Sequence, residues 1–87
     1  MHQVTWLDKA VEELANIWLA ATPTERAAIT NAANTIDQVL SRDPHQQGES
    51  RAGEHRIFFA LPLGANFRIE RHAPIVVVTH VWFVKAK

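Results

Sequence analysis

The first half of the chain repeats apolar residues at the spacing of a helix. Between residues 8 and 21 the apolar stripe consists of Val11, Leu14, Trp18 and Ala21. Its members lie three or four residues apart, and Lys9, Glu12, Glu13 and Asn16 fill the other face. This period is typical of a helix that buries one face. The pattern predicts a helix over 8–20 whose apolar stripe joins the core.

A second helix begins at the clearest local signal in the sequence. Thr22, Pro23 and Glu25 match a capping box with proline at the first helical position. The expected buried positions are Ile29, Ala33, Ile36 and Leu40. Asp43-Pro44 then ends the helix. We predict a helix over 23–41, and the tight connection makes the two helices an antiparallel hairpin.

The period changes to two in the second half, after a polar segment over 44–53 that is expected to form a loop. Residues 56–60, 63–70 and 75–84 are predicted strands joined by short turns, which makes them an antiparallel meander. Residues 2–6 alternate as a short opening strand. The order β-α-α-β-β-β over 1–87 predicts a single α+β domain, in which the helical hairpin covers one face of a small, mostly antiparallel four-strand sheet.

Alternation also predicts which strand residues face away from the helices. If Ile57 and Phe59 face the helices, Arg56 faces outward. Phe67 and Ile69 are likewise expected to face the helices, so Arg68 and Glu70 face outward. On the last strand Val76, Val78, His80 and Trp82 are expected to share one face. If that face is the open one, Arg56, Arg68, His80 and Trp82 come together on adjacent strands.

Charge divides the chain into two halves of opposite sign. Residues 1–50 carry three cations against seven carboxylates, and residues 51–87 carry six cations against two carboxylates. The formal net charge of zero therefore conceals acidic helices and a basic sheet. A basic half suggests a polyanionic or acidic-protein partner.

Composition excludes several classes of site. There is no cysteine, so neither a disulfide framework nor a thiolate metal site is available. His45, His55 and His72 lack metal-ligand spacing, and we expect no metal and no cofactor. No apolar run is long enough to span a bilayer, and the first residues do not match a signal peptide. A cytoplasmic protein without a membrane partner is expected.

Three motifs, with the element order and the small size, carry a resemblance over nearly the whole chain. They are Trp6-x-x-x-Ala10-x-x-x-Leu14 after the opening strand, Gly48-Glu49-Ser50-Arg51 before the meander, and Phe67-Arg68 in its second strand. The chain thereby resembles the RelE/ParE family of type II toxins. The resemblance implies a compact toxin that is neutralised by a cognate antitoxin wrapped around it. Members of the family either cleave messenger RNA on the ribosome or poison DNA gyrase.

The sequence departs from the RNA-cleaving members at three places. The chain is neutral rather than strongly basic, and it contains no tyrosine. The stretch from Val81 to Lys85 stands where many members carry a basic tail. Arg56 is the one cation on the first meander strand, where some members have paired lysines. The neutral charge and the missing basic tail favour gyrase inhibition, and the surface of arginines and histidines favours RNA cleavage, which is slightly preferred of the two. A third alternative is a degenerate member that binds a partner without toxicity.

The candidate site follows from the chemistry of RNA cleavage, which needs a base, an acid and cations for the phosphate. Candidate catalytic residues are Arg56, Arg68 and His80. Candidate residues for binding nucleic acid or the antitoxin are Arg51, Arg56, Arg68, Trp82 and Lys85. The glutamate at position 49 is a candidate general base or a solvated turn residue. The competing structural interpretations are an Arg68–Glu70 salt bridge, a core histidine at 80 and a packing tryptophan at 82. The oligomeric state stays open.

Overall fold

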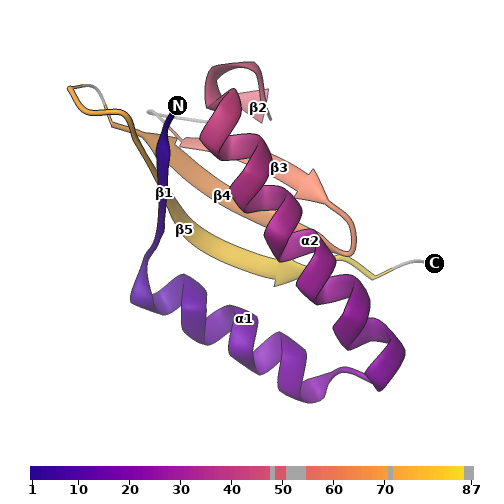
Figure 1. Cartoon of the computed structure of the whole chain (residues 1–87). Helices are drawn as coiled ribbons and strands as arrows, with labels where there is room; N and C mark the ends of the chain where they lie inside the picture. The colour runs from indigo at the N-terminus through magenta and orange to yellow at the C-terminus, as the bar shows by residue number, and fades with distance from the viewer. Residues whose placement is uncertain (48, 51–54, 71, 86–87) are drawn as a thin grey trace.

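The computed structural model describes residues 1–47, 49–50, 55–70 and 72–85, and it confirms the predicted α+β fold (Figure 1). Its elements are β1 (Gln3–Trp6), α1 (Asp8–Ala20), α2 (Pro23–Arg42), the 3₁₀ turn η1 (Pro44–Gln46), β2 (Glu49–Ser50), β3 (His55–Ala60), β4 (Leu63–Ile69) and β5 (Ile75–Phe83). Four of the strands are those predicted. The fifth, β2, is a two-residue strand within the segment that was predicted to be a loop. No described helix combines the length and apolar character needed to cross a membrane.

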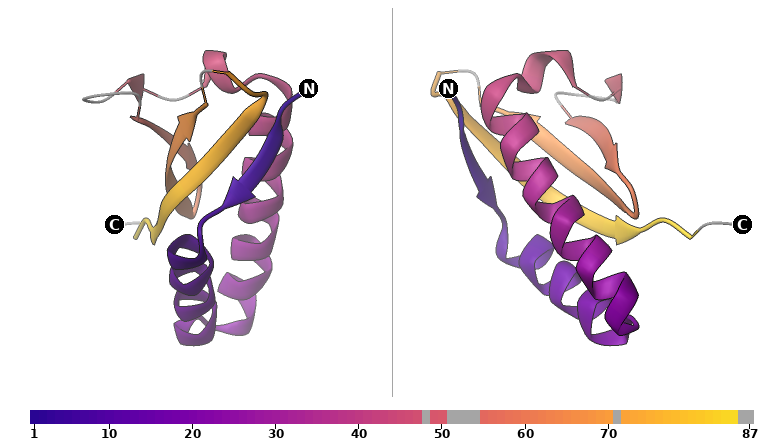
Figure 2. Two further views of the ribbon diagram at one scale, coloured as in Figure 1. Left: turned by 90° about the vertical axis from the view of Figure 1, so that its left-hand side faces the viewer. Right: turned by 45° about the vertical axis from the view of Figure 1, so that its right-hand side comes forward.

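The sheet has the order β1-β5-β4-β3-β2, with β1 parallel to β5 and the other pairs antiparallel. The long apolar strand β5 is therefore internal, as its sequence predicted. Both helices lie on the same side of the sheet (Figure 2). Helix α1 contacts mainly β5, and α2 contacts β1, β3 and β4. The opposite side, which we call the open face, is not covered by either helix.

At the connection between the helices, side chains form hydrogen bonds with the free backbone groups at the helix ends. The Glu25 amide donates to the Thr22 hydroxyl at 3.2 Å, and the Thr22 amide donates to the Glu25 carboxylate at 2.8 Å. This confirms the predicted capping box. Arg26 donates to the carbonyls of Trp18 and Leu19 at the end of α1, at 2.9 and 3.2 Å. Its guanidinium also lies 4.3 Å from the centre of the Trp18 ring, a cation–π contact.

The core lies between α2, the start of α1 and the helix-facing side of the sheet. Its buried members are Ala10, Ile29, Ala32, Ile36, Leu40, Leu63, Ala65, Phe67, Val76, Val78 and Val81. The predicted core stripe of α1 is partly wrong, because Val11 is 51% exposed and Trp18 is 40% exposed. On α2 the fully buried alanine is Ala32, while Ala33 is half-buried.

The prediction of which β3 side chains point toward the helices is wrong. Arg56, Phe58 and Ala60 pair with Phe67, Ala65 and Leu63 of β4, all three of which are fully buried beneath the helices. Directly paired residues point to the same side of a sheet. The side chains of Ile57 and Phe59 therefore lie on the open face. The segment Arg-Ile-Phe-Phe-Ala holds no polar alternation from which this facing could be read.

The facing predicted for β5 changes in the middle of the strand. Phe67 pairs with Val78, but its neighbour Asn66 pairs with His80, so Thr79 is an extra residue opposite β4. Such a bulge reverses the alternation beyond it. Val76 and Val78 face the helices, whereas His80 and Trp82 lie on the open face. At the bulge, the Thr79 hydroxyl donates to the Asn66 carbonyl at 3.1 Å. The prediction that Val76, Val78, His80 and Trp82 share a face is therefore wrong.

Candidate functional site

Three strands contribute side chains to the open face. By the register, the open-face positions are His55, Ile57 and Phe59 on β3, Asn66 and Arg68 on β4, with Gly64 between the aromatic residues, and Val77, His80 and Trp82 on β5. Three predicted site residues, Arg68, His80 and Trp82, are thus brought to one face. His80 sits opposite Asn66 of β4, and Arg68, two residues beyond Asn66 on β4, sits opposite Val77 on the far side of the bulge.

The aromatic part of the open face is built around Gly64. A Cβ atom at position 64 would lie 2.5 Å from the Trp82 indole, so the absence of a side chain lets the ring rest against the backbone of β4. The Phe59 ring stands edge-on to Trp82, with 6.2 Å between ring centroids and an interplanar angle of 86°. Phe59 is 54% exposed. The pair offers aromatic surface of the kind that stacks on a base or anchors a protein partner.

We expect Gly64→Ala to displace Trp82 from the sheet and to cost about 1–3 kcal/mol of stability, because the added methyl group overlaps the indole. Urea denaturation measures the cost, and near-ultraviolet circular dichroism reports the ring. The same substitution made in a Trp82→Ala background should cost much less. Equal costs in the two backgrounds would show that the indole is not what Gly64 accommodates.

The polar part of the open face holds one arginine and several groups with unused hydrogen-bonding capacity. Arg68 contacts Glu70 at 3.4 Å, a salt bridge between residues two apart in sequence and not across strands. Both side chains are more than a third exposed, so the pair is weak and the guanidinium stays accessible. The amide oxygen of Asn66 and Nδ1 of His55 are buried and have no hydrogen-bond partner among the described residues. A ligand on this face would meet the guanidinium of Arg68, whereas these two polar atoms lie beneath the surface.

His80 lies at the margin of the open face, next to a carboxylate from α1. Its Nδ1 is 3.6 Å from Oε2 of Glu13, and Oε1 of the same carboxylate accepts a hydrogen bond from the Val81 amide at 3.1 Å. The His80 side chain is 44% exposed. The interpretation of His80 as a core histidine is therefore wrong.

Arg56 does not belong to this site. It lies on the helix-facing side of β3, where Nη1 donates to the carbonyls of His45 and Gln47 at 3.3 and 3.4 Å. The guanidinium thus joins β3 to the segment that follows α2. Arg51 lies outside the described residues, and Lys85 is exposed just beyond β5. In the described part of the chain, no three His, Asp or Glu side chains gather as a metal site requires.

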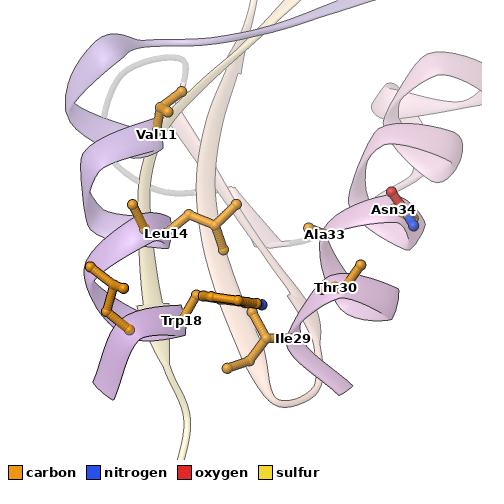
Figure 3. Close-up of a pocket in the computed structure, with 9 residues that line it drawn as sticks. Val11, Leu14, Trp18, Ile29, Thr30, Ala33 and Asn34 are labelled. Atoms are coloured by element: carbon orange, nitrogen blue, oxygen red, sulfur yellow. The ribbon is translucent and has the colours of Figure 1, made fainter. Parts of the chain in front are cut away.

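A second candidate surface lies between the two helices. This groove has a volume of about 430 Å³. It is lined by Val11, Leu14, Ala15, Trp18, Leu19, Ile29, Thr30, Ala33 and Asn34. Figure 3 shows Leu14 and Trp18 of α1 pointing across it toward Ile29 of α2. Three of the four residues in the apolar stripe that was predicted to be core on α1, Val11, Leu14 and Trp18, form a wall of this groove.

Comparison with known proteins identifies the fold. No family model matches the sequence, and no curated protein matches it by sequence. Among solved structures, a chain of the chromosomal ParDE TA system from P. aeruginosa aligns with a TM-score of 0.76 at 17% identity, covering 98% of each chain. A chain of the toxin–antitoxin complex RelBE2 from Mycobacterium tuberculosis aligns with a TM-score of 0.66 at 20% identity, covering 94% of this chain and 96% of that one. The protein therefore has the RelE/ParE-like fold that its sequence predicted.

Proposed function

We propose that this protein is the toxin of a type II toxin–antitoxin system. The observation that carries the proposal is the shared fold, which covers 98% of this chain and 98% of a chain in a ParDE TA system. A second toxin–antitoxin complex shares the fold at lower similarity. The two surfaces of the molecule suit the two tasks of such a protein, since one can bind a neutralising partner and the other a cellular target.

The groove between α1 and α2 is the proposed binding site for the antitoxin. Val11, Trp18 and Leu19 expose 51, 40 and 66% of their surface there. An exposed apolar groove of this kind suits the apolar face of an amphipathic helix. Residues 1–50, which hold both helices, carry a net negative charge, so basic residues flanking that apolar face would complement it.

The open face is the proposed site of action, and we propose messenger-RNA cleavage on the ribosome as the activity. Arg68 would neutralise charge on the phosphate. His80 would take the proton from the attacking 2′-hydroxyl or donate a proton to the leaving 5′-oxygen. Trp82 and Phe59 would stack on bases beside them. Support comes from the presence of all four side chains on one face, with a carboxylate next to the histidine.

Inhibition of DNA gyrase is the second candidate, and the position of Arg56 favours it. The guanidinium of Arg56 points away from the open face, so two of the three proposed catalytic residues remain there. The exposed Phe59 and Leu61, at 54 and 72%, are suited to contact with a protein target. A protein that acts by binding would need this apolar surface and no proton-transfer group.

Expression of the wild-type chain without its antitoxin separates the two activities. Rapid fragmentation of messenger RNA supports cleavage, and DNA damage with intact RNA supports gyrase inhibition. His80→Ala should abolish the first outcome and leave the second unchanged, because the histidine is needed for proton transfer and not for apolar contact. Unimpeded growth with stable expression would reject both activities.

A further inference from the structure

Glu13 holds an unusual position for an acidic residue on the polar side of a helix. Strand β1 ends at Trp6, opposite Val78, and the Leu7 amide makes the last hydrogen bond to β5 at 3.0 Å. Farther along the same edge of β5, the Val81 amide donates to Oε1 of Glu13 instead. The carboxylate takes the place of a strand carbonyl, and this hydrogen bond fixes its position.

The second oxygen of this fixed carboxylate faces a group of the open face. Oε2 of Glu13 lies 3.6 Å from Nδ1 of His80, the residue next to Val81. Hydrogen bonds at catalytic groups are often long in the uncomplexed protein and shorten when substrate binds. With Nδ1 turned toward Glu13, the other ring nitrogen, Nε2, is the one left for a ligand.

We propose that Glu13 is a positioning residue for His80. By accepting from Nδ1–H, the carboxylate holds the neutral imidazole in the tautomer whose Nε2 carries a free lone pair. The lone pair can then take a proton from a 2′-hydroxyl on the open face, with Arg68 nearby for the phosphate. This is the arrangement of a base and the group that orients it, as in the Ser-His-Asp triad. The inference rests on the proposed RNA-cleaving activity.

The tautomer of His80 tests the contact without reference to activity. The ¹⁵N shifts of labelled histidine at about pH 8 distinguish the two tautomers, and a His80→Gln variant assigns the resonance among the five histidines. In the wild type we expect mainly Nδ1–H. In Glu13→Gln the amide oxygen can still accept from Val81, while its NH₂ group can only donate to Nδ1, so the ring should switch to Nε2–H.

The matched control is Glu12→Gln, which removes the same charge from the neighbouring, exposed position of α1. It should leave both the tautomer and the cleavage rate unchanged. Glu13→Gln should lower the rate at least about 10-fold, a part of the roughly 10²–10⁴-fold that general acid–base catalysis contributes. An identical tautomer in the wild type and Glu13→Gln would overturn the proposal, as would an unchanged rate.

Failure of the underlying function has a different signature. If the wild type shows the Nδ1–H tautomer and cleaves no RNA on ribosomes, the cleavage activity and the use of Glu13 in it are refuted, although the contact itself exists. A Glu13→Ala variant completes the set, because it removes the acceptor of the Val81 amide. Loss of cleavage in Glu13→Ala together with full cleavage in Glu13→Gln would assign Glu13 to structure alone and overturn the proposal.

Discussion

Replacing Val11 and Leu19 together by glutamate is expected to weaken the antitoxin complex at least about 100-fold, the equivalent of about 2.7 kcal/mol. Both residues line the groove between α1 and α2, and both are more than half exposed in the free protein. An apolar helix docked there would have to bury two carboxylates without partners, which is costly. Calorimetric titration of the antitoxin into the purified protein measures the loss of affinity.

The free protein should tolerate this double substitution, because exposed side chains contribute little to the core. Leu61→Glu is the control, since Leu61 is 72% exposed and does not line the groove. It should leave antitoxin affinity within about twofold of the wild-type value, a difference of about 0.4 kcal/mol. Unchanged affinity in the Val11→Glu/Leu19→Glu protein would place the antitoxin elsewhere.

Reversing the charge of Arg56 should destabilise the fold far more than reversing that of Arg68. Arg56→Glu loses two hydrogen bonds from a charged donor and brings a carboxylate toward the carbonyl oxygens of His45 and Gln47. We expect a cost of about 2–4 kcal/mol. Arg68 pairs only with exposed Glu70 among the described side chains, so Arg68→Glu should cost less than about 1 kcal/mol.

Urea denaturation of the two single variants gives this comparison directly. Equal and small losses would mean that the bonds from Arg56 to the segment after α2 do not stabilise the fold. The sequence-based expectation was that both arginines face outward, away from the helices. The structure limits this expectation to Arg68, because Arg56 lies on the helix-facing side.

The helices and their connection could be predicted because their signals are local. A capping box needs two residues three positions apart, Thr22 and Glu25, and Pro23 at the first helical position adds to the signal. The bulge at Thr79 could not be predicted, because it depends on how β5 aligns with β4 and not on either strand alone. The bulge places His80 and Trp82 on the open face, where the candidate site lies, while Val76 and Val78 face the helices.

The candidate site was predicted in part. Arg68, His80 and Trp82 were named from residue type and alternation, and they do share the open face. Glu13 was missed, because an acidic residue on the polar side of a helix gives no sign that it lies beside a strand 68 residues away in sequence. The groove was missed because an apolar helical stripe reads in the same way whether it enters the core or forms an open wall.

Growth of cells that express the protein is the most direct test of the proposal that it is a toxin neutralised by an antitoxin. The wild-type chain is expressed alone, and then together with the proposed antitoxin, while growth is recorded. We expect growth arrest in the first case and recovery in the second, with recovery lost when the chain carries Val11→Glu and Leu19→Glu. Normal growth of cells that accumulate the folded wild-type chain alone would contradict the account.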